Sequence, residues 1–150
     1  FPPCTAQACM EMLDHYGFDP AGKRVAVIGR SLVIGKPVAM MMMRRDATVT
    51  ICHSRTGSDV MRSVGHDADI IVAAAGKAKM VGPDITGDGK IIIDVGINID
   101  DDGKLCGDVD FDAVSEKAEA ITPVPGGVGS VTTAVLMKHV IEAAAKAYKA

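Results

Sequence analysis

The chain has 150 residues, of which 48% are hydrophobic and 23% are charged. This length and composition predict a single domain with a sizeable buried core. The net charge of −3 argues against a nucleic-acid-binding protein, because such proteins usually carry a basic face. No apolar run approaches the roughly 18 residues that a membrane-spanning helix needs, and the start lacks a secretion signal. Because the sequence opens with FPPCT and no initiator methionine, we expect a processed chain or a piece of a longer protein.

The spacing of the four cysteines does not indicate a metal site. They stand at positions 4, 9, 52 and 106, without C-x-x-C spacing and without a histidine cluster. We therefore expect four reduced thiols in a cytoplasmic protein rather than a zinc site. Aromatic residues make up only 3%, so the core must consist of Val, Ile, Ala and Met.

Apolar segments of helical and strand period alternate along the chain. We expect helices at 4–18, 37–45, 58–65, 110–118 and 130–149, and strands at 24–29, 47–54, 68–76, 90–96 and 119–123. This alternation predicts an α/β fold of the Rossmann-like, doubly wound kind, with a mostly parallel sheet and helices on both faces. Ligands bind such sheets beyond the carboxyl ends of the strands.

Local signals place several helix ends and one excursion. Thr5 and Ser58 are candidate N-caps, and Gly17 can close the first helix in the left-handed conformation. In that helix the residues Cys9, Leu13 and Tyr16 share one stripe. Residues 98–109 indicate a hairpin or an irregular excursion, and the aspartates at 100–102 indicate a solvated turn tip, with a metal site as the alternative.

The stretch GRSLVIG, residues 29–35, resembles a dinucleotide-binding turn but departs from its consensus sequence. The usual fingerprint is G-x-G-x-x-G, whereas here Ser31 replaces the middle glycine and the spacing is one residue longer. The loop follows the first predicted strand and precedes a helix, where backbone N–H groups can receive a pyrophosphate. Ser31 keeps the approach open and adds a hydroxyl donor. A tight strand-to-helix turn without a ligand is the alternative.

The end of the second predicted strand carries no acid. An NAD-binding domain usually places Asp or Glu there to accept hydrogen bonds from the ribose 2′-hydroxyl, but this chain reads CHSRT at 52–56. Ser54 would instead donate to a 2′-phosphate, and Arg30 from the glycine loop can reach the same corner. This pattern predicts NADP as the cofactor. Arg55 is equally compatible with a solvated loop charge, and we expect His53 to pack or hydrogen-bond locally.

Six ordered motifs carry a resemblance to a known family. They are GRSLVIGKPVA, ATVTICHSRT, ADIIVAAAGK, IIIDVGIN, GDVDF and ITPVPGGVGSVT. Together they are similar to the C-terminal NAD(P)-binding half of the bifunctional methylenetetrahydrofolate dehydrogenase/cyclohydrolase, and the match spans nearly the whole chain. The resemblance implies one domain over 1–150, with a linker and connecting helix at 1–23. The N-terminal catalytic domain of that family would lie outside this chain.

The resemblance also implies a reaction and a set of site residues. The family oxidises 5,10-methylenetetrahydrofolate with NADP and hydrolyses the methenyl product to 10-formyltetrahydrofolate. Gly29, Arg30, Ser31 and Ser54 would hold NADP, with Arg30 and Ser54 at the 2′-phosphate, and Ile97 would lie against the cofactor. The folate pocket would be bordered by Pro125, Gly126, Gly127, Val128 and Gly129. An unusual turn before the last helix is the alternative interpretation of this loop.

Three positions depart from the family pattern by replacing a proline, namely Ala6, Ala78 and Ser130. Alanine suits the first residue of a helix, and Ser130 could cap the last helix. Ala78 would loosen a loop near the nicotinamide end of the cofactor.

The chain lacks the family's catalytic lysine, which lies in a Y-x-x-x-K motif of the N-terminal domain. We therefore assign no catalytic residue here, and we expect the Asp94 carboxylate to be satisfied by loop N–H groups. A non-catalytic NADP-binding or assembly module is the alternative function. The family further implies tetrahydrofolate derivatives and the N-terminal domain as partners, a homodimer, a cytoplasmic location and a role in one-carbon metabolism and purine biosynthesis. We expect no metal and no nucleic-acid or membrane partner.

Overall fold

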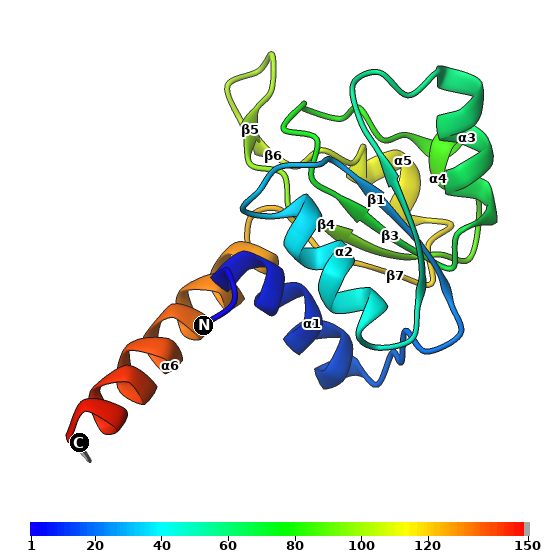
Figure 1. Ribbon diagram of the computed structural model, residues 1–150. Helices are drawn as coiled ribbons and strands as arrows, with labels where there is room; N and C mark the ends of the chain where they lie inside the picture. The colour runs from blue at the N-terminus through cyan, green and yellow to red at the C-terminus, as the bar shows by residue number, and fades with distance from the viewer. Residues whose placement is uncertain (149–150) are drawn as a thin grey trace.

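A five-stranded parallel sheet forms the centre of the molecule (Figure 1). The computed structural model describes residues 1–148. The strands lie in the order β2-β1-β3-β4-β7, and every neighbouring pair is parallel. Their bounds are β1 (Arg24–Ile28), β2 (Thr48–Cys52), β3 (Ile70–Ala73), β4 (Ile91–Asp94) and β7 (Ala120–Ile121). The predicted α/β fold with a parallel sheet is confirmed.

Helices cover both faces of this sheet, because its central strands are apolar on both sides. In β1, Val25 and Val27 belong to the core under α1, α2 and the start of α6, whereas Ala26 and Ile28 belong to the core under α3, α4 and α5. The helices are α1 (Cys4–Tyr16), α2 (Gly35–Met43), α3 (Ser58–Asp67), α4 (Pro83–Thr86), α5 (Phe111–Ser115) and α6 (Val128–Tyr148). The result is a three-layer sandwich with a separate core on each side of the sheet.

The excursion after β4 is a hairpin, as one of the two sequence interpretations expected. Its strands β5 (Asn98–Ile99) and β6 (Leu105–Cys106) are antiparallel. At its tip, Asp100 Oδ1 accepts hydrogen bonds from the N–H groups of Asp102 (3.1 Å) and Lys104 (2.9 Å). Within residues 1–148 no group of three potential metal ligands occurs, so the aspartate run forms a turn.

Several predicted helix ends differ from the structure. The left-handed Gly17 (φ 74°) closes α1 as predicted. Thr5 is not the cap of α1, because the helix already begins at Cys4 and Pro3 takes the capping position. Ser58 likewise is the first residue of α3 and makes no capping hydrogen bond. A cap depends on the backbone conformation at that residue, which the residue type alone does not determine.

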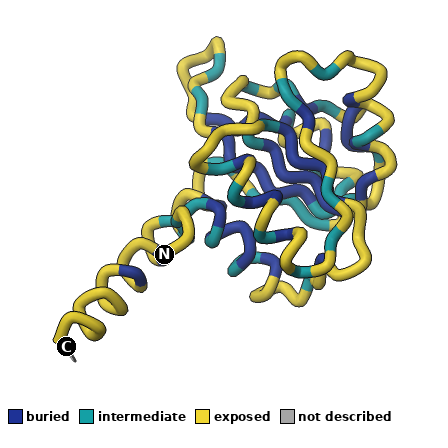
Figure 2. The backbone as a smooth tube through the Cα atoms, in the orientation of Figure 1, coloured by how far each residue is buried: buried dark blue, intermediate teal, exposed yellow. Residues whose placement is uncertain are grey.

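Helix α6 leaves the body of the molecule and runs outward (Figure 1). Its outer turns are exposed almost all round (Figure 2). Large apolar side chains on this exposed part are Leu136, Met137, Val140, Ile141 and Tyr148. No helix among the described residues is long and apolar enough to span a membrane.

Two core predictions meet different outcomes. Cys9 and Leu13 are buried in the core, as their stripe predicted, but Tyr16 is 65% exposed because it lies in the last turn of α1, beyond the edge of that core. All four cysteines are free thiols, as expected.

Candidate functional site: a dinucleotide-binding edge

The order in which strands are added to the sheet reverses at β1. β2 is added on one side of β1, and β3 is added on its other side, so β1 and β3 are neighbours although β2 lies between them in sequence. Gly29 follows β1 at this point with φ 133°. A side chain on Gly29 would overlap the Ala74 carbonyl at the end of β3. Only glycine fits both the backbone angle and the space. A crevice at the carboxyl ends of β1 and β3 is where doubly wound sheets bind their ligands.

The loop between Gly29 and α2 presents unpaired donors. Within the described chain, no group accepts a hydrogen bond from the backbone N–H groups of residues 30–33. The Ser31 hydroxyl oxygen accepts hydrogen bonds from the N–H groups of Ile34 (3.1 Å) and Gly35 (3.4 Å). Its own proton is therefore free to be donated outward. This loop fits a phosphate ligand, because it offers several donors at the start of a helix.

Helix α2 begins at Gly35, two residues before the predicted start at Pro37. A side chain on Gly35 would overlap the Gly29 carbonyl. The glycines at both ends of the loop are thus needed for the close packing of its two ends. Pro37 lies in the first helical turn, where its missing N–H would have no partner in any case.

The loop after β2 leaves the sheet at the same corner as the glycine loop. Ile28 and Cys52 are register partners, and the Gly29 N–H donates to the Cys52 carbonyl at 2.9 Å. His53 is hydrogen-bonded locally, as expected, because its Nδ1 accepts from the Arg55 N–H at 3.2 Å. The side chain of Ser54 therefore lies on an exposed loop next to the glycine loop.

Three exposed side chains at this corner, Arg30, Ser54 and Arg55, can donate to an anion. Within residues 1–148 no carboxylate forms an ion pair with either arginine. Positive charge that is not already neutralised is available for a phosphate group.

Asp94 ends β4 and stabilises the neighbouring loops. Its carboxylate is 3% exposed and accepts hydrogen bonds from the N–H groups of Gly96, Asp108 and Val109, each at 2.9 Å. This confirms the expected structural role. Burial of the carboxylate raises the pKa of Asp94 above its ordinary value, against the opposing effect of these N–H donors.

Asp108 is the site residue that sequence reasoning missed. It is fully buried and accepts hydrogen bonds from the N–H groups of Ala75, Gly76 and Lys77 and from Asn98 Nδ2. It thereby ties the loop after β3 to the hairpin. Asp108 lies in the motif GDVDF, which contributed only to the family resemblance.

Ile97 and the loop 125–129 lie together, although Pro125 comes 28 positions after Ile97 in the sequence. Both line a cavity of about 190 Å³ that also reaches Asp94. Ile97 is 69% exposed. The structure thus brings the expected cofactor contact and the expected substrate loop to one cavity.

The glycines in this loop have different requirements. Gly126 has a positive φ of 94°. Gly127 does not, but a side chain there would overlap the Pro123 carbonyl. Gly129 has neither a positive φ nor any atom within 4 Å of an added Cβ, because it lies in the first turn of α6.

The three positions that replace a proline fall into ordinary backbone. Ala6 is the third residue of α1 rather than the first, and it is fully buried. Ser130 does not cap α6, because the helix begins at Val128 and the Ser130 N–H donates to the Gly127 carbonyl at 3.1 Å. Ala78 lies in the turn after β3, next to Lys77, whose N–H is held by Asp108.

This arrangement defines a class. A parallel sheet with a glycine turn at its switch point and free N–H donors at the following helix is a Rossmann-like dinucleotide-binding domain. Residues 3–148 match the family described as "Tetrahydrofolate dehydrogenase/cyclohydrolase, NAD(P)-binding domain". The chain belongs to this family, as the resemblance predicted.

Similar proteins agree with this assignment. The chain is 59% identical over 145 residues to the bifunctional protein FolD of Carboxydothermus hydrogenoformans, and 54% identical over 143 residues to that of Clostridioides difficile. These matches cover 95% of this chain but only 50% and 49% of the two relatives. The chain thus spans about half the length of the curated relatives it matches.

Solved structures show the same relation. A FolD methylenetetrahydrofolate dehydrogenase/cyclohydrolase from Campylobacter jejuni superposes with a TM-score of 0.93 at 41% identity, over 97% of this chain and 51% of that one. The Trypanosoma brucei enzyme, solved in complex with NADP cofactor and an inhibitor, gives a TM-score of 0.93 at 40% identity, over 100% and 52%.

Proposed function

We propose that this chain is the NADP-binding half of an enzyme that oxidises 5,10-methylenetetrahydrofolate to 5,10-methenyltetrahydrofolate and hydrolyses that product to 10-formyltetrahydrofolate. The observation that carries the proposal is the common sheet edge. It brings together the glycine loop, the acid-free corner after β2, and the cavity shared by Ile97 and the loop 125–129. One edge thus offers places for the phosphates, the 2′-phosphate and the reacting end of a dinucleotide.

Each part of the edge has a task in this proposal. The free N–H groups of residues 30–33 bind the pyrophosphate, and Arg30 and Ser54 bind the 2′-phosphate. When bound, NADP supplies the acceptor for the hydride. Ile97 lies against the cofactor and excludes water from it, while the loop 125–129 forms one wall of the folate pocket. Asp94 and Asp108 hold the two loops that carry these contacts.

The opposite wall of the active site belongs to the N-terminal catalytic domain in this proposal. Hydride transfer needs the two reactants in a fixed mutual orientation, and hydrolysis needs an acid–base group in the pocket. The exposed apolar side chains of α6 support contact with a further part of the protein, because such groups usually mark an interface when they are contiguous. We further propose a homodimer through this domain, a cytoplasmic location and a contribution to purine biosynthesis, with no nucleic-acid or membrane partner.

Titration of the 150-residue chain with NADP and with NAD tests the assignment of the corner. NADP should bind about tenfold to a hundredfold more tightly, since charge-assisted hydrogen bonds contribute roughly 1.5–3 kcal/mol. Arg30→Ala should remove most of this preference. Arg24→Ala is the matched control, because Arg24 is exposed at the start of β1, at the opposite end of that strand from the loop that carries Arg30. Equal affinities for the two cofactors, or unchanged NADP affinity in Arg30→Ala, would contradict the proposal.

A further inference from the structure

A thiol and an imidazole from opposite ends of the chain meet where α1 contacts α6. Cys4 is the first residue of α1, and His139 lies in the middle of α6. Cys4 Sγ and His139 Nδ1 are 3.6 Å apart, a hydrogen-bond distance for sulfur. Cys4 is half-buried, and His139 is 8% exposed. This pair lies outside the dinucleotide-binding edge.

The neighbouring hydrogen bonds decide which nitrogen of His139 carries the proton. Gln7 Nε2 donates to Glu11 Oε1 at 3.0 Å, which leaves Gln7 Oε1 as an acceptor. His139 Nε2 lies 2.8 Å from that oxygen and must therefore carry the donating proton. In the neutral ring the other nitrogen, Nδ1, then has a free lone pair. That lone pair faces the thiol of Cys4.

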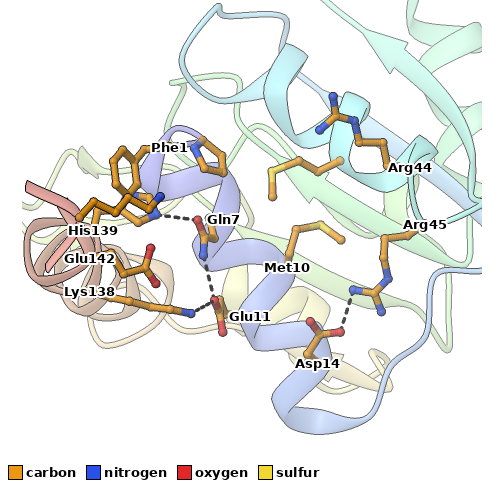
Figure 3. A pocket seen from close by; sticks show the side chains of 13 residues that line it. Phe1, Gln7, Met10, Glu11, Asp14, Arg44, Arg45, Lys138, His139 and Glu142 are labelled. Carbon is orange, nitrogen blue, oxygen red and sulfur yellow. Dashed lines mark hydrogen bonds and ion pairs between the residues drawn. The ribbon is translucent and has the colours of Figure 1, made fainter. Parts of the chain in front are cut away.

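Further groups fix this arrangement in space (Figure 3). Lys138 Nζ donates to Glu11 Oε1 at 3.1 Å, so Glu11 stays ionised and holds the Gln7 amide in one orientation. The Phe1 ring packs against the imidazole with centroids 5.0 Å apart. His139 and Gln7 also line a cavity of about 570 Å³ between α1, α2 and α6, so the imidazole borders an open space.

The other three thiols lack these features. Cys9 is fully buried and donates to the Thr5 carbonyl, and burial raises its pKa to about 12. Burial also raises the pKa of Cys52, and Cys106 is 9% exposed. Among the described residues, a histidine nitrogen within hydrogen-bond reach of sulfur is found only for Cys4.

We propose that Cys4 is an activated nucleophile with His139 as its general base and Gln7 as the group that orients the base, and that it undergoes exchange with small disulfides. A thiol, a base and an orienting amide in hydrogen-bond sequence are the arrangement that activates cysteine nucleophiles. The thiol proton moves to His139 Nδ1, and the sulfur attacks one sulfur of the disulfide. The disulfide bond breaks, and the departing thiolate takes up the proton from His139. Cys4 ends oxidised in a mixed disulfide, and one molecule of free thiol is released.

This inference does not rest on the proposed function, because it uses no residue of the dinucleotide-binding edge. The experiment follows the reaction of the native 150-residue chain with oxidised glutathione at pH 7. Intact mass gives the rate of mixed-disulfide formation, and peptide mapping identifies the modified cysteine. The variants are Cys4→Ser, His139→Asn, Gln7→Ala and, as the matched control, His15→Asn. His15 is an exposed histidine on the same helix as Cys4.

We expect Cys4 to be modified first and Cys4→Ser to abolish this first reaction. His139→Asn should slow the modification of Cys4 by roughly tenfold, and Gln7→Ala should slow it by a smaller factor, whereas His15→Asn should match the parent chain. The far-ultraviolet circular dichroism of each variant checks that it is folded. If the His139→Asn chain does not fold, the Gln7→Ala chain still tests the proposal. Modification of another cysteine first would overturn the proposal, and so would equal rates in the parent, His139→Asn and Gln7→Ala chains.

Discussion

Two buried carboxylates, Asp94 and Asp108, accept hydrogen bonds from the backbone of the loops at the carboxyl edge of the sheet. Between them they accept hydrogen bonds from six backbone N–H groups in three separate loops. A buried N–H left without a partner costs about 1–3 kcal/mol, so each carboxylate satisfies groups that the loops alone could not. One of these loops carries Ile97, which lines the cavity at this edge. Two acidic residues thus give the loops at this edge a fixed geometry.

The glycines of the loop 125–129 provide a prediction at the residue scale. Gly127→Ala should lower the free energy of unfolding by about 1–3 kcal/mol, because the new Cβ would overlap the Pro123 carbonyl. Gly129→Ala is the matched control two residues away, with no atom near its Cβ. It should leave the stability unchanged or raise it by up to about 1 kcal/mol, because alanine favours the helix in which it lies.

Urea unfolding of both variants, followed by circular dichroism, measures these changes. Equal stability of the two variants would mean that the backbone at Gly127 shifts to accommodate a side chain at little cost. In a protein that also contains the catalytic half, Gly127→Ala should impair folate turnover more than NADP binding. Normal folate kinetics would show that the loop has only a structural role.

At the scale of elements, α6 is held by its first half. Val135 is 4% exposed and belongs to the core that α1 shares, whereas Val140 on the same helix is 58% exposed. Val135→Ala should lower the free energy of unfolding by about 1–2 kcal/mol, because it removes buried apolar surface and leaves a cavity. Val140→Ala should have almost no effect on the 150-residue chain.

Both valine substitutions change helix propensity in the same way, so their difference reports packing alone. Thermal unfolding of the two variants gives this comparison. A similar loss of stability for both would mean that the outer half of α6 is also packed in the isolated chain. The structure argues otherwise, since these outer turns are exposed (Figure 2).

The elements differ in how far the sequence could predict them. The apolar runs before Gly29 and around Ile70 predicted buried strands correctly, because a strand covered on both faces leaves a continuous apolar signal. The predicted starts of α1 and α3 are correct, but the caps expected at Thr5, Ser58 and Ser130 are wrong, because the cap depends on the local backbone conformation and not on the residue type alone.

At the scale of the whole molecule, contacts between distant segments explain what the sequence could not predict. The role of Asp94 could be predicted because it ends a strand and is followed by a loop. The contact between Cys4 and His139 spans 135 positions, and no periodicity or spacing relates the two residues. It arises because α6 returns from the sheet and packs along α1. The candidate cofactor residues were easier to predict, because they lie at strand ends that the parallel topology places along one edge.

The whole molecule leads to a prediction about activity. The 150-residue chain should bind NADP but show no methylenetetrahydrofolate dehydrogenase or cyclohydrolase turnover. Its edge provides the glycine loop, the phosphate corner and the loop 125–129, which form one wall of a site. Orientation of both reactants can contribute about 7–11 kcal/mol to the barrier reduction, and a single wall cannot supply it. The cavity beside Ile97 is also too small, at about 190 Å³, to enclose a folate and exclude water from it.

An assay of NADPH formation with methylenetetrahydrofolate on the purified chain measures this. A parallel preparation of Arg30→Ala controls for contaminating host enzyme, because a contaminant would give the same rate in both. Addition of a catalytic half from a FolD protein should produce activity if the two halves associate through α6. The exposed apolar side chains of α6 provide a surface for that contact. Turnover by the chain alone on the order of 1 per second or more, lost in Arg30→Ala, would show that a catalytic group lies within these residues.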